Sequence, residues 1–334
     1  MRAISLFSGV GGSCLGMKQA GYETHGYELN TWCVDRAIEC GCDASVMDLS
    51  VETPTCEQPD HVHISSPCLG FTRCATLARQ HSSIRNLTVR SAEILLDLNP
   101  ATFSFENAPE CIKYAEHNEF IRLATQRYHI IGFNTDASRL GCCQIRHRFF
   151  MIGMRASETS MQALLDLLPT IREVNQRGRR TTIRDALPVE KQIFVYPRGC
   201  KDRCLFQPDE CLPTLRRMSH ATPSTSIHTS VSWGVGVDAA MDKDCIVLDN
   251  TLTALASGFP PGYFDFRPRE KTRYALAFGN VVPPPVQLWV MQQVAAVRPH
   301  AGDGEGGGAY HRAVFPLSRR HDYGESQRRG ESDS

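Results

Sequence analysis

The sequence AISLFSGVGG, residues 3–12, is the first indication of the fold. Residues 3–7 form the short apolar run of a fully buried strand. Glycines within 9–12 allow a sharp turn, and the chain then shows the apolar periodicity of a helix. A buried strand that turns directly into a helix predicts an α/β fold.

The same alternation continues along the first half of the chain. Strands that alternate with helices form a mostly parallel, Rossmann-like sheet with helices on both faces. In such sheets, ligands bind beyond the carboxyl ends of the strands. Further strands are expected at residues 22–27, 46–47, 61–65, 101–105, 128–133 and 148–153, and helices at residues 31–40, 89–98 and 117–127. Residues 274–297 show an apolar, helix-like pattern, in which the prolines after Gly279-Asn280 stiffen the entry to a helix.

Four side chains with useful chemistry fall at the expected carboxyl ends of strands: Glu28, Asp48, Cys68 and Glu106. Because the carboxyl ends of parallel strands share one edge of the sheet, we expect these side chains to line a common site. Each of them alone has an ordinary alternative as a solvated carboxylate or a structural cysteine.

The segment SSPCLGFTRC, residues 65–74, places Cys68 on a short loop. Pro67 makes the backbone rigid before the cysteine, and Gly70 allows a turn after it. A nucleophile needs such a frame because it must be exposed and reproducibly placed. The loop alone favours a nucleophile only weakly over a structural cysteine.

The glycine turn does not match the common nucleotide motifs. A dinucleotide fingerprint needs glycine where Cys14 stands, and a P-loop needs a lysine that is absent. A nucleotide-like ligand without a pyrophosphate, or a purely structural turn, is therefore expected. In the first case, Glu28 would bind the two ribose hydroxyls and Asp48 would accept from an adenine amino group.

Two further segments carry candidate polar chemistry. Glu106, in FENAPE, has apolar neighbours in the sequence, and a carboxyl group in apolar surroundings retains a proton that it can donate to a ring nitrogen. The alternative for FENAPE is the start of a helix. QIRHR, residues 144–148, places Arg146 and Arg148 on one side of an extended segment. The two arginines can bind a phosphate or a carboxylate, or they can form the solvated face of an edge strand.

The second half of the chain is less regular. Residues 172–184 carry five arginines against one glutamate, and the following residues are rich in Pro, Cys, Thr and Ser. We expect a catalytic domain formed by residues 1–171 and 249–298, a small irregular lobe at 172–248, and a disordered tail at 299–334.

Composition limits the choice of compartment and partner. The formal net charge is zero, so a basic surface for nucleic acid must be local. No apolar run approaches the roughly 18 residues that span a bilayer. Fourteen scattered cysteines without a secretory signal favour reduced thiols. Cys200, Cys204 and Cys211, with His220, fit no common zinc spacing, so we expect no metal.

Taken together, these segments resemble the cytosine-5 DNA methyltransferases. The resemblance runs from residue 4 to about 155 and resumes from about 249 to 295. The similar segments are FSGVGG, Glu28, Asp48-Leu49, SPCLGF, FENA, QIRHR, SGFPPGYFDF and GNVVPPPV. The sequence departs from the family pattern at Ser66 and Leu69, where the family usually has Pro and Gln, and at Ala108, where it has Val.

The resemblance implies methyl transfer from S-adenosylmethionine to carbon-5 of a cytosine flipped out of double-stranded DNA. The catalytic residues would be Cys68, Glu106, Arg146 and Arg148, with Arg148 steadying the base and Glu106, and with Arg146 contributing to the same wall of the site. The cofactor would contact Phe7, Gly9, Gly11, Gly12, Glu28, Leu29, Asp48, Leu49, Pro67, Asn280 and Val281. We expect a monomer in the cytoplasm of a bacterium or of a phage-infected cell.

Three alternatives stay open at this point. PCLGFTR has some likeness to a branch that methylates tRNA, which leaves an RNA cytosine-5 methyltransferase of the same fold. A catalytically silent DNA-binding homologue is a second alternative, although it would not need Cys68, Glu106 and Arg148 together. Transfer of a group other than methyl is the third.

Overall fold

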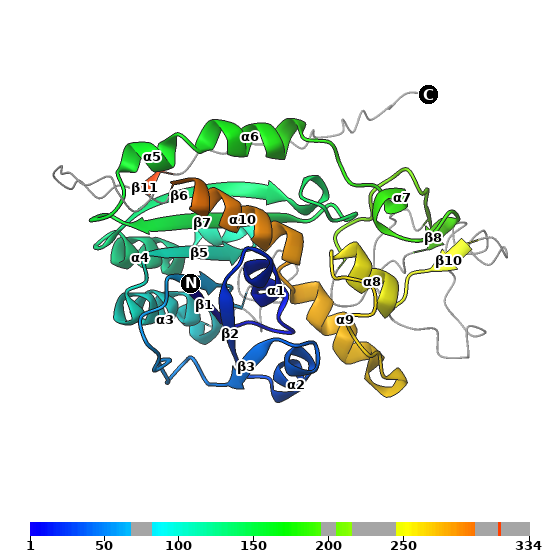
Figure 1. The fold of residues 1–334 in the computed structure, drawn as a ribbon, viewed down its shortest axis with the longest axis horizontal. Helices are drawn as coiled ribbons and strands as arrows, with labels where there is room; N and C mark the ends of the chain where they lie inside the picture. The colour runs from blue at the N-terminus through cyan, green and yellow to red at the C-terminus, as the bar shows by residue number, and fades with distance from the viewer. Residues whose placement is uncertain (68–81, 195–204, 216–244, 298–312, 315–334) are drawn as a thin grey trace, which may run out of the picture.

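The structure is a computed structural model and describes residues 1–67, 82–194, 205–215, 245–297 and 313–314. Its centre is a sheet with the strand order β11-β6-β7-β5-β4-β1-β2-β3 (Figure 1). The strands are β1 (Arg2–Leu6), β2 (Glu23–Glu28), β3 (Asp43–Val46), β4 (His61–Ile64), β5 (Thr102–Asn107), β6 (Tyr128–Asp136), β7 (His147–Arg155) and β11 (Ala313–Val314).

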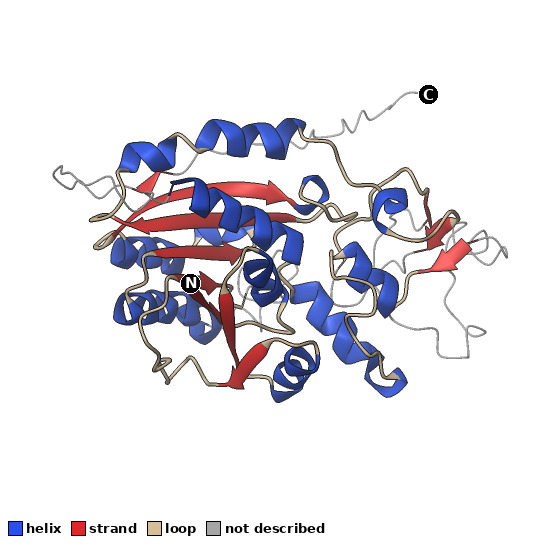
Figure 2. Ribbon diagram, in the orientation of Figure 1, coloured by secondary structure: helices blue, strands red, loops and turns tan. Residues whose placement is uncertain are grey.

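Helices cover both faces of this sheet, as the sequence predicts (Figure 2). One face packs on α3 (Ser82–Leu98) and α4 (Ala115–Ala124). The other face packs on α1 (Gly12–Gln19), α2 (Thr31–Glu39), α5 (Met161–Leu165), α6 (Leu168–Arg177) and α10 (Pro284–Val297). Within the described ranges, no helix is both long and apolar enough to cross a membrane.

Strand β7 runs antiparallel to both of its neighbours, while the remaining pairs in this sheet are parallel. The reason is local, because only residues 137–146, which include the short η4 (Ala137–Arg139), separate β6 from β7. So short a connection permits only an antiparallel return. As a result, the start of β7 lies beside the carboxyl end of β5, where Asn107 pairs with Phe149.

The helix-like pattern over residues 274–297 corresponds to two helices, and the second begins at the prolines, as expected. The first, α9 (Lys271–Asn280), ends at Asn280, and α10 begins at Pro284. Pro283, Pro284 and Pro285 lack the backbone donors that a continuous helix needs, and Pro283 disfavours the helical conformation at Val282 before it. The chain is already extended at Val281, where α9 ends. The prolines instead begin α10, where a missing N–H costs little.

A small second sheet has the order β10-β8-β9 and lies beyond the carboxyl end of β6 (Figure 1). Its core consists of residues from α7, α8, the small sheet and their connections, including Ile183, Ile193 and Leu248. The elements here are α7 (Ile183–Ala186), β8 (Gln192–Phe194), β9 (Leu205–Phe206), β10 (Cys245–Val247) and α8 (Asn250–Ala256), with η3 (Pro109–Lys113) and η6 (Pro268–Glu270) elsewhere in the chain.

The domain limits proposed from the sequence remain predictions. Helix α6 spans the expected boundary at residue 172 and packs with α10 against β6 and β7. In the tail that we expected to be disordered, Ala313 and Val314 form β11 and pair parallel with Ile130 and Ile131 of β6. Apart from these two residues, positions 299–334 lie outside the described residues.

A row of buried polar side chains lies in the centre of the sheet. Ser104 Oγ is 2.8 Å from His63 Nδ1 and 3.0 Å from His61 Nε2, and it accepts from Gln287 Nε2 of α10 at 3.3 Å. His63 Nε2 is buried with no hydrogen-bond partner among the described residues. A proton there would be buried without an acceptor, and burial lowers the pKa of His63 to about 3.

This burial makes stability depend on pH. An unfolded chain protonates His63 below its ordinary pKa of about 6.5, whereas the folded protein holds it neutral down to about 3. The unfolded state therefore binds more protons in this window, and the free energy of unfolding falls as the pH drops from 6.5 toward 3. Each such proton contributes a slope of up to about 1.4 kcal/mol per pH unit.

Urea unfolding between pH 7 and pH 5 measures this slope. His63→Asn removes the titration and keeps a nitrogen for Ser104, so its unfolding free energy should depend less steeply on pH than that of the wild type. Parallel curves for the two proteins would contradict the assignment.

Candidate active site

The turn after β1 has an unusual backbone. Phe7 has φ 60°, a left-handed conformation that is rare for an aromatic residue, and Gly9 and Gly11 also have positive φ. Strain of this kind is maintained only where the surroundings enforce it, and it gathers at binding sites. The turn is held by Glu28, whose Oε2 accepts from Gly9 N–H at 3.0 Å and whose Oε1 accepts from Asn30 N–H at 2.9 Å.

The three glycines of this turn have different surroundings. A Cβ at Gly9 would meet nothing within 4 Å, so this position faces open space. A Cβ at Gly11 would lie 2.9 Å from Cys42 Sγ, and one at Gly12 would lie 2.6 Å from Val281 Cγ2. Gly9 therefore leaves room for a ligand, whereas Gly11 and Gly12 permit close packing of α1 against neighbouring segments.

The other residues expected around a cofactor are spread along the same edge of the sheet. Leu29 is 62% exposed, whereas Leu49 is buried in the core. Asp48 lies two residues beyond β3, and the hydroxyl and N–H of Ser50 lower the pKa of its carboxyl. Ser8 Oγ is buried and has no partner among the described residues. An open glycine, an unsatisfied hydroxyl and two carboxylates suit a polar nucleoside-like ligand.

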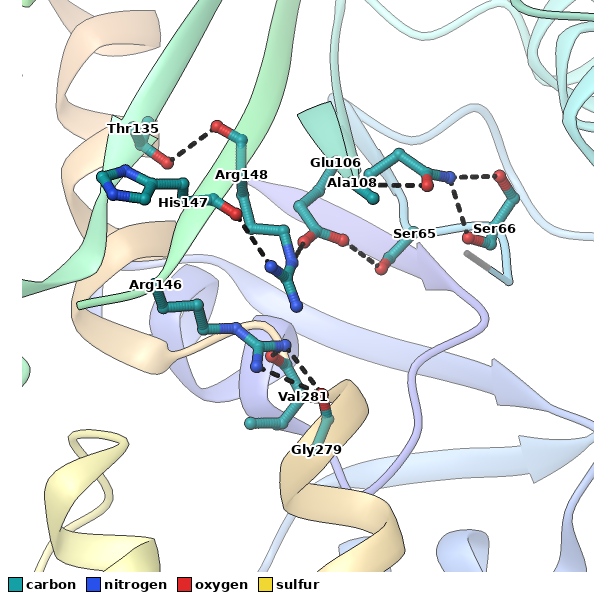
Figure 3. A network of polar contacts seen from close by, with 11 residues as sticks. Ser65, Ser66, Glu106, Ala108, Thr135, Arg146, His147, Arg148, Gly279 and Val281 are labelled. Atoms are coloured by element: carbon teal, nitrogen blue, oxygen red, sulfur yellow. Dashed lines mark hydrogen bonds and ion pairs between the residues drawn. The ribbon is translucent and has the colours of Figure 1, made fainter. Parts of the chain in front are cut away.

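Glu106 lies at the carboxyl end of β5 and is almost completely buried. Its Oε1 is 3.0 Å from Arg148 Nε, and its Oε2 accepts from the Ser65 hydroxyl at 2.7 Å (Figure 3). The expectation of apolar surroundings is therefore wrong, because a guanidinium and a hydroxyl each contact one carboxylate oxygen. These contacts fix the carboxylate beside the segment that leads to Cys68.

The next residue of β5 also holds that segment. Asn107 Nδ2 donates to the Ser66 carbonyl at 3.0 Å and to the Ser66 hydroxyl at 3.3 Å. Pro67 follows as the last described residue before a gap, and Cys68 lies outside the described residues. The sequence analysis did not single out Ser65 or Ser66 as site residues. Their position directly before Pro67 and Cys68 was the one feature of the sequence that could have indicated these contacts.

The QIRHR segment is extended, but its three alternate side chains reach different partners. Arg148 contacts Glu106, while Arg146 donates to the carbonyls of Gly279 at 3.1 Å and Val281 at 2.9 Å (Figure 3). Gln144 Nε2 donates to the Ser257 hydroxyl at 2.9 Å. Arg146 thus holds the backbone on both sides of Asn280, whose side chain is exposed.

The sequence profile of the family described as C-5 cytosine-specific DNA methylase matches residues 1–193. The chain belongs to this family. It is a DNA (cytosine-5-)-methyltransferase. The profile covers the glycine turn, Glu106 and QIRHR.

Individual relatives agree with this result. Type II methyltransferase M.HindV of Haemophilus influenzae is 30% identical over 247 residues, and the match covers 67% of the present chain and 75% of M.HindV. M.HgiDI of Herpetosiphon aurantiacus is 27% identical over 236 residues, covering 67% and 74%. The solved S. pombe Dnmt2 methyltransferase matches with a TM-score of 0.63 at 16% identity, over 88% of the methylase and 98% of that chain, and supports the fold.

Several of the described cysteines are poorly suited to be nucleophiles. Burial raises the pKa of the Cys14, Cys142 and Cys143 thiols, and it raises the pKa of Cys33 to about 12. A thiol that stays protonated does not attack. Among the described residues, no group of His, Cys, Asp and Glu is arranged to hold a metal, and Cys211 Sγ donates to the Thr181 carbonyl.

The glycines of the turn give a matched test. Gly12→Ala should lower the free energy of unfolding of the methylase by roughly 1–3 kcal/mol, because its Cβ would be forced into the 281–282 backbone and Val281. Gly9→Ala should cost less in stability, because only the strain of its positive φ opposes the change. Urea titration of both variants measures this difference, and equal losses would contradict the assigned contacts.

Proposed function

We propose that the methylase flips a cytosine out of duplex DNA and methylates carbon-5 through a covalent bond between Cys68 and carbon-6. The observation that carries this proposal is the buried Glu106 carboxylate, fixed by Arg148 and Ser65 beside the segment that leads to Cys68. The pKa values of the described thiols give further support, since several are raised by burial and leave Cys68 as the better candidate.

We infer that S-adenosylmethionine is the methyl donor and that it binds at the glycine turn. When bound, it supplies an electrophilic methyl group. The Glu28 carboxylate would bind the ribose hydroxyls, the open space at Gly9 would admit the ligand, and Asp48 would face the adenine. Arg146 would not touch the reacting atoms, because its guanidinium holds the backbone that carries Asn280 and Val281.

The base chemistry follows from the carboxylate site. A cytosine in a duplex is inaccessible, so it must leave the stack at a cost of a few kcal/mol. The Cys68 thiolate then adds to carbon-6, and negative charge develops toward ring nitrogen 3. Glu106 holds a hydrogen bond or a proton at that nitrogen. Carbon-5 becomes nucleophilic, and after methylation it loses its proton as the Cys68–carbon-6 bond breaks.

Binding of double-stranded DNA would use local positive charge, because the net charge of the chain is zero. Arg172 and Arg177 of α6 and Arg184 of α7 are exposed, whereas Arg179 pairs with Asp185 at 2.9 Å. The relatives M.HindV and M.HgiDI are named Type II methyltransferases, so we place this reaction in bacterial restriction–modification, in the cytoplasm of a bacterium or of a phage-infected cell.

Trapping the covalent intermediate tests the proposed function. Duplex DNA containing 5-fluorocytosine, incubated with the methylase and S-adenosylmethionine, should give a protein–DNA adduct that survives denaturation. Fluorine cannot leave as a proton does, so the adduct cannot resolve. Cys68→Ser should give no adduct, and Glu106→Gln should form it at least about 100-fold more slowly.

A tRNA substrate with the same substitution serves as the second arm of this test. Methylation of duplex DNA with no reaction on tRNA supports the proposal. Methylation of tRNA alone would overturn the DNA assignment. An adduct that persists in Cys68→Ser would show that another residue is the nucleophile.

A further inference from the structure

Two buried hydroxyl groups meet behind the carboxylate site. Ser66 Oγ and Thr88 Oγ1 are 3.0 Å apart, and both side chains are excluded from solvent. Ser66 follows the end of β4, whereas Thr88 belongs to the second turn of α3. The contact therefore joins two elements that are separated by 22 positions in the chain.

The position of this contact in the sequence gives it a consequence for Cys68. Ser66 lies two residues before Cys68, and α3 is the first element described after the gap at residues 68–81. The hydroxyl pair thus ties together the two described segments that flank the proposed nucleophile. Asn107 adds two hydrogen bonds to Ser66, so residue 66 is held by β5 as well as by α3.

Residue 66 is also where this sequence departs from its family, which usually has a proline. A proline would restrict φ at this position through its ring. A serine leaves φ free, and its backbone must be restrained by contacts instead. The structure supplies these contacts through the carbonyl and hydroxyl of Ser66. The hydroxyl pair therefore does by hydrogen bonding what a proline ring does by covalent geometry.

We propose that Ser66 and Thr88 are positioning residues for the covalent step of methylation. Their hydrogen bond fixes the backbone before Cys68 relative to Glu106, so that the thiolate and the carboxylate act on the same base. This inference rests on the proposed function. Both hydroxyls are excluded from solvent and bond to each other, so we expect neither to contact the base or the cofactor. Their loss should change the rate of attack and leave substrate binding unchanged.

The test is the single-turnover rate of adduct formation with 5-fluorocytosine duplex DNA. Ser66→Ala and Thr88→Val should each slow the adduct about 10-fold or more, because small misplacements of reacting groups are costly. Affinities for the DNA and for S-adenosylmethionine should change less than about twofold, since only positioning is lost. The double variant should be no slower than the slower single variant, because both substitutions break the same bond.

Two further variants separate positioning from stability. Thr88→Ser keeps the hydroxyl and should recover most of the rate. Ser91→Ala removes another buried hydroxyl of α3, one that donates to its own helix at Leu87, and should leave the rate unchanged. If Ser66→Ala does not fold, the comparison of the adduct rates of Thr88→Val and Thr88→Ser tests the positioning role.

Several outcomes would overturn the inference. They are a Thr88→Val variant with the wild-type rate, an equal loss in Ser91→Ala, or losses that multiply in the double variant. If the wild type forms no adduct, the proposed function itself fails. If the wild type forms the adduct and the Ser66 and Thr88 variants match it, only the positioning role fails.

Discussion

The contact between Arg148 and Glu106 is the interaction on which the site depends. It joins the start of β7 to the end of β5, with 3.0 Å between Arg148 Nε and Glu106 Oε1. Both side chains are largely buried, at 16% and 7% exposure, so each loses most of its hydration. Because desolvation can cancel the attraction of such a pair, the pair is weak evidence for stability, and its placement at a strand end favours a functional role.

The antiparallel direction of β7 makes this contact possible. A parallel β7 would end, rather than begin, at this edge of the sheet and would place Arg148 at the opposite edge. The same turn of the chain also brings Arg146 to the carbonyls of Gly279 and Val281. The segment of residues 146–148 therefore contacts two parts of the site. Arg148 holds the Glu106 carboxylate, and Arg146 holds the junction of α9 and α10, which packs against Gly12 of the glycine turn.

Much of this arrangement was predictable from the sequence. The alternation of strands and helices gives the sheet, and the carboxyl ends of parallel strands bring Glu28 and Glu106 to one edge. The family resemblance implied that Arg148 steadies Glu106, but the residues alone did not give the partners of these side chains, because the partners depend on register. Glu106 has apolar neighbours in the sequence, but pairing with β7 brings a guanidinium to it. Likewise, Gly12 belongs to a ligand-like motif, yet its lack of a side chain is required by the 281–282 segment, which is distant in the chain.

A double-mutant cycle on methyl transfer to duplex DNA tests the central contact most directly. Glu106→Gln, Arg148→Gln and the double variant would be compared with the wild type in single turnovers. If Arg148 acts by holding Glu106, each single variant should lose at least about 100-fold, and the double variant should be no slower than the slower single variant. Losses that multiply, or an Arg148→Gln variant with the wild-type rate, would contradict the account.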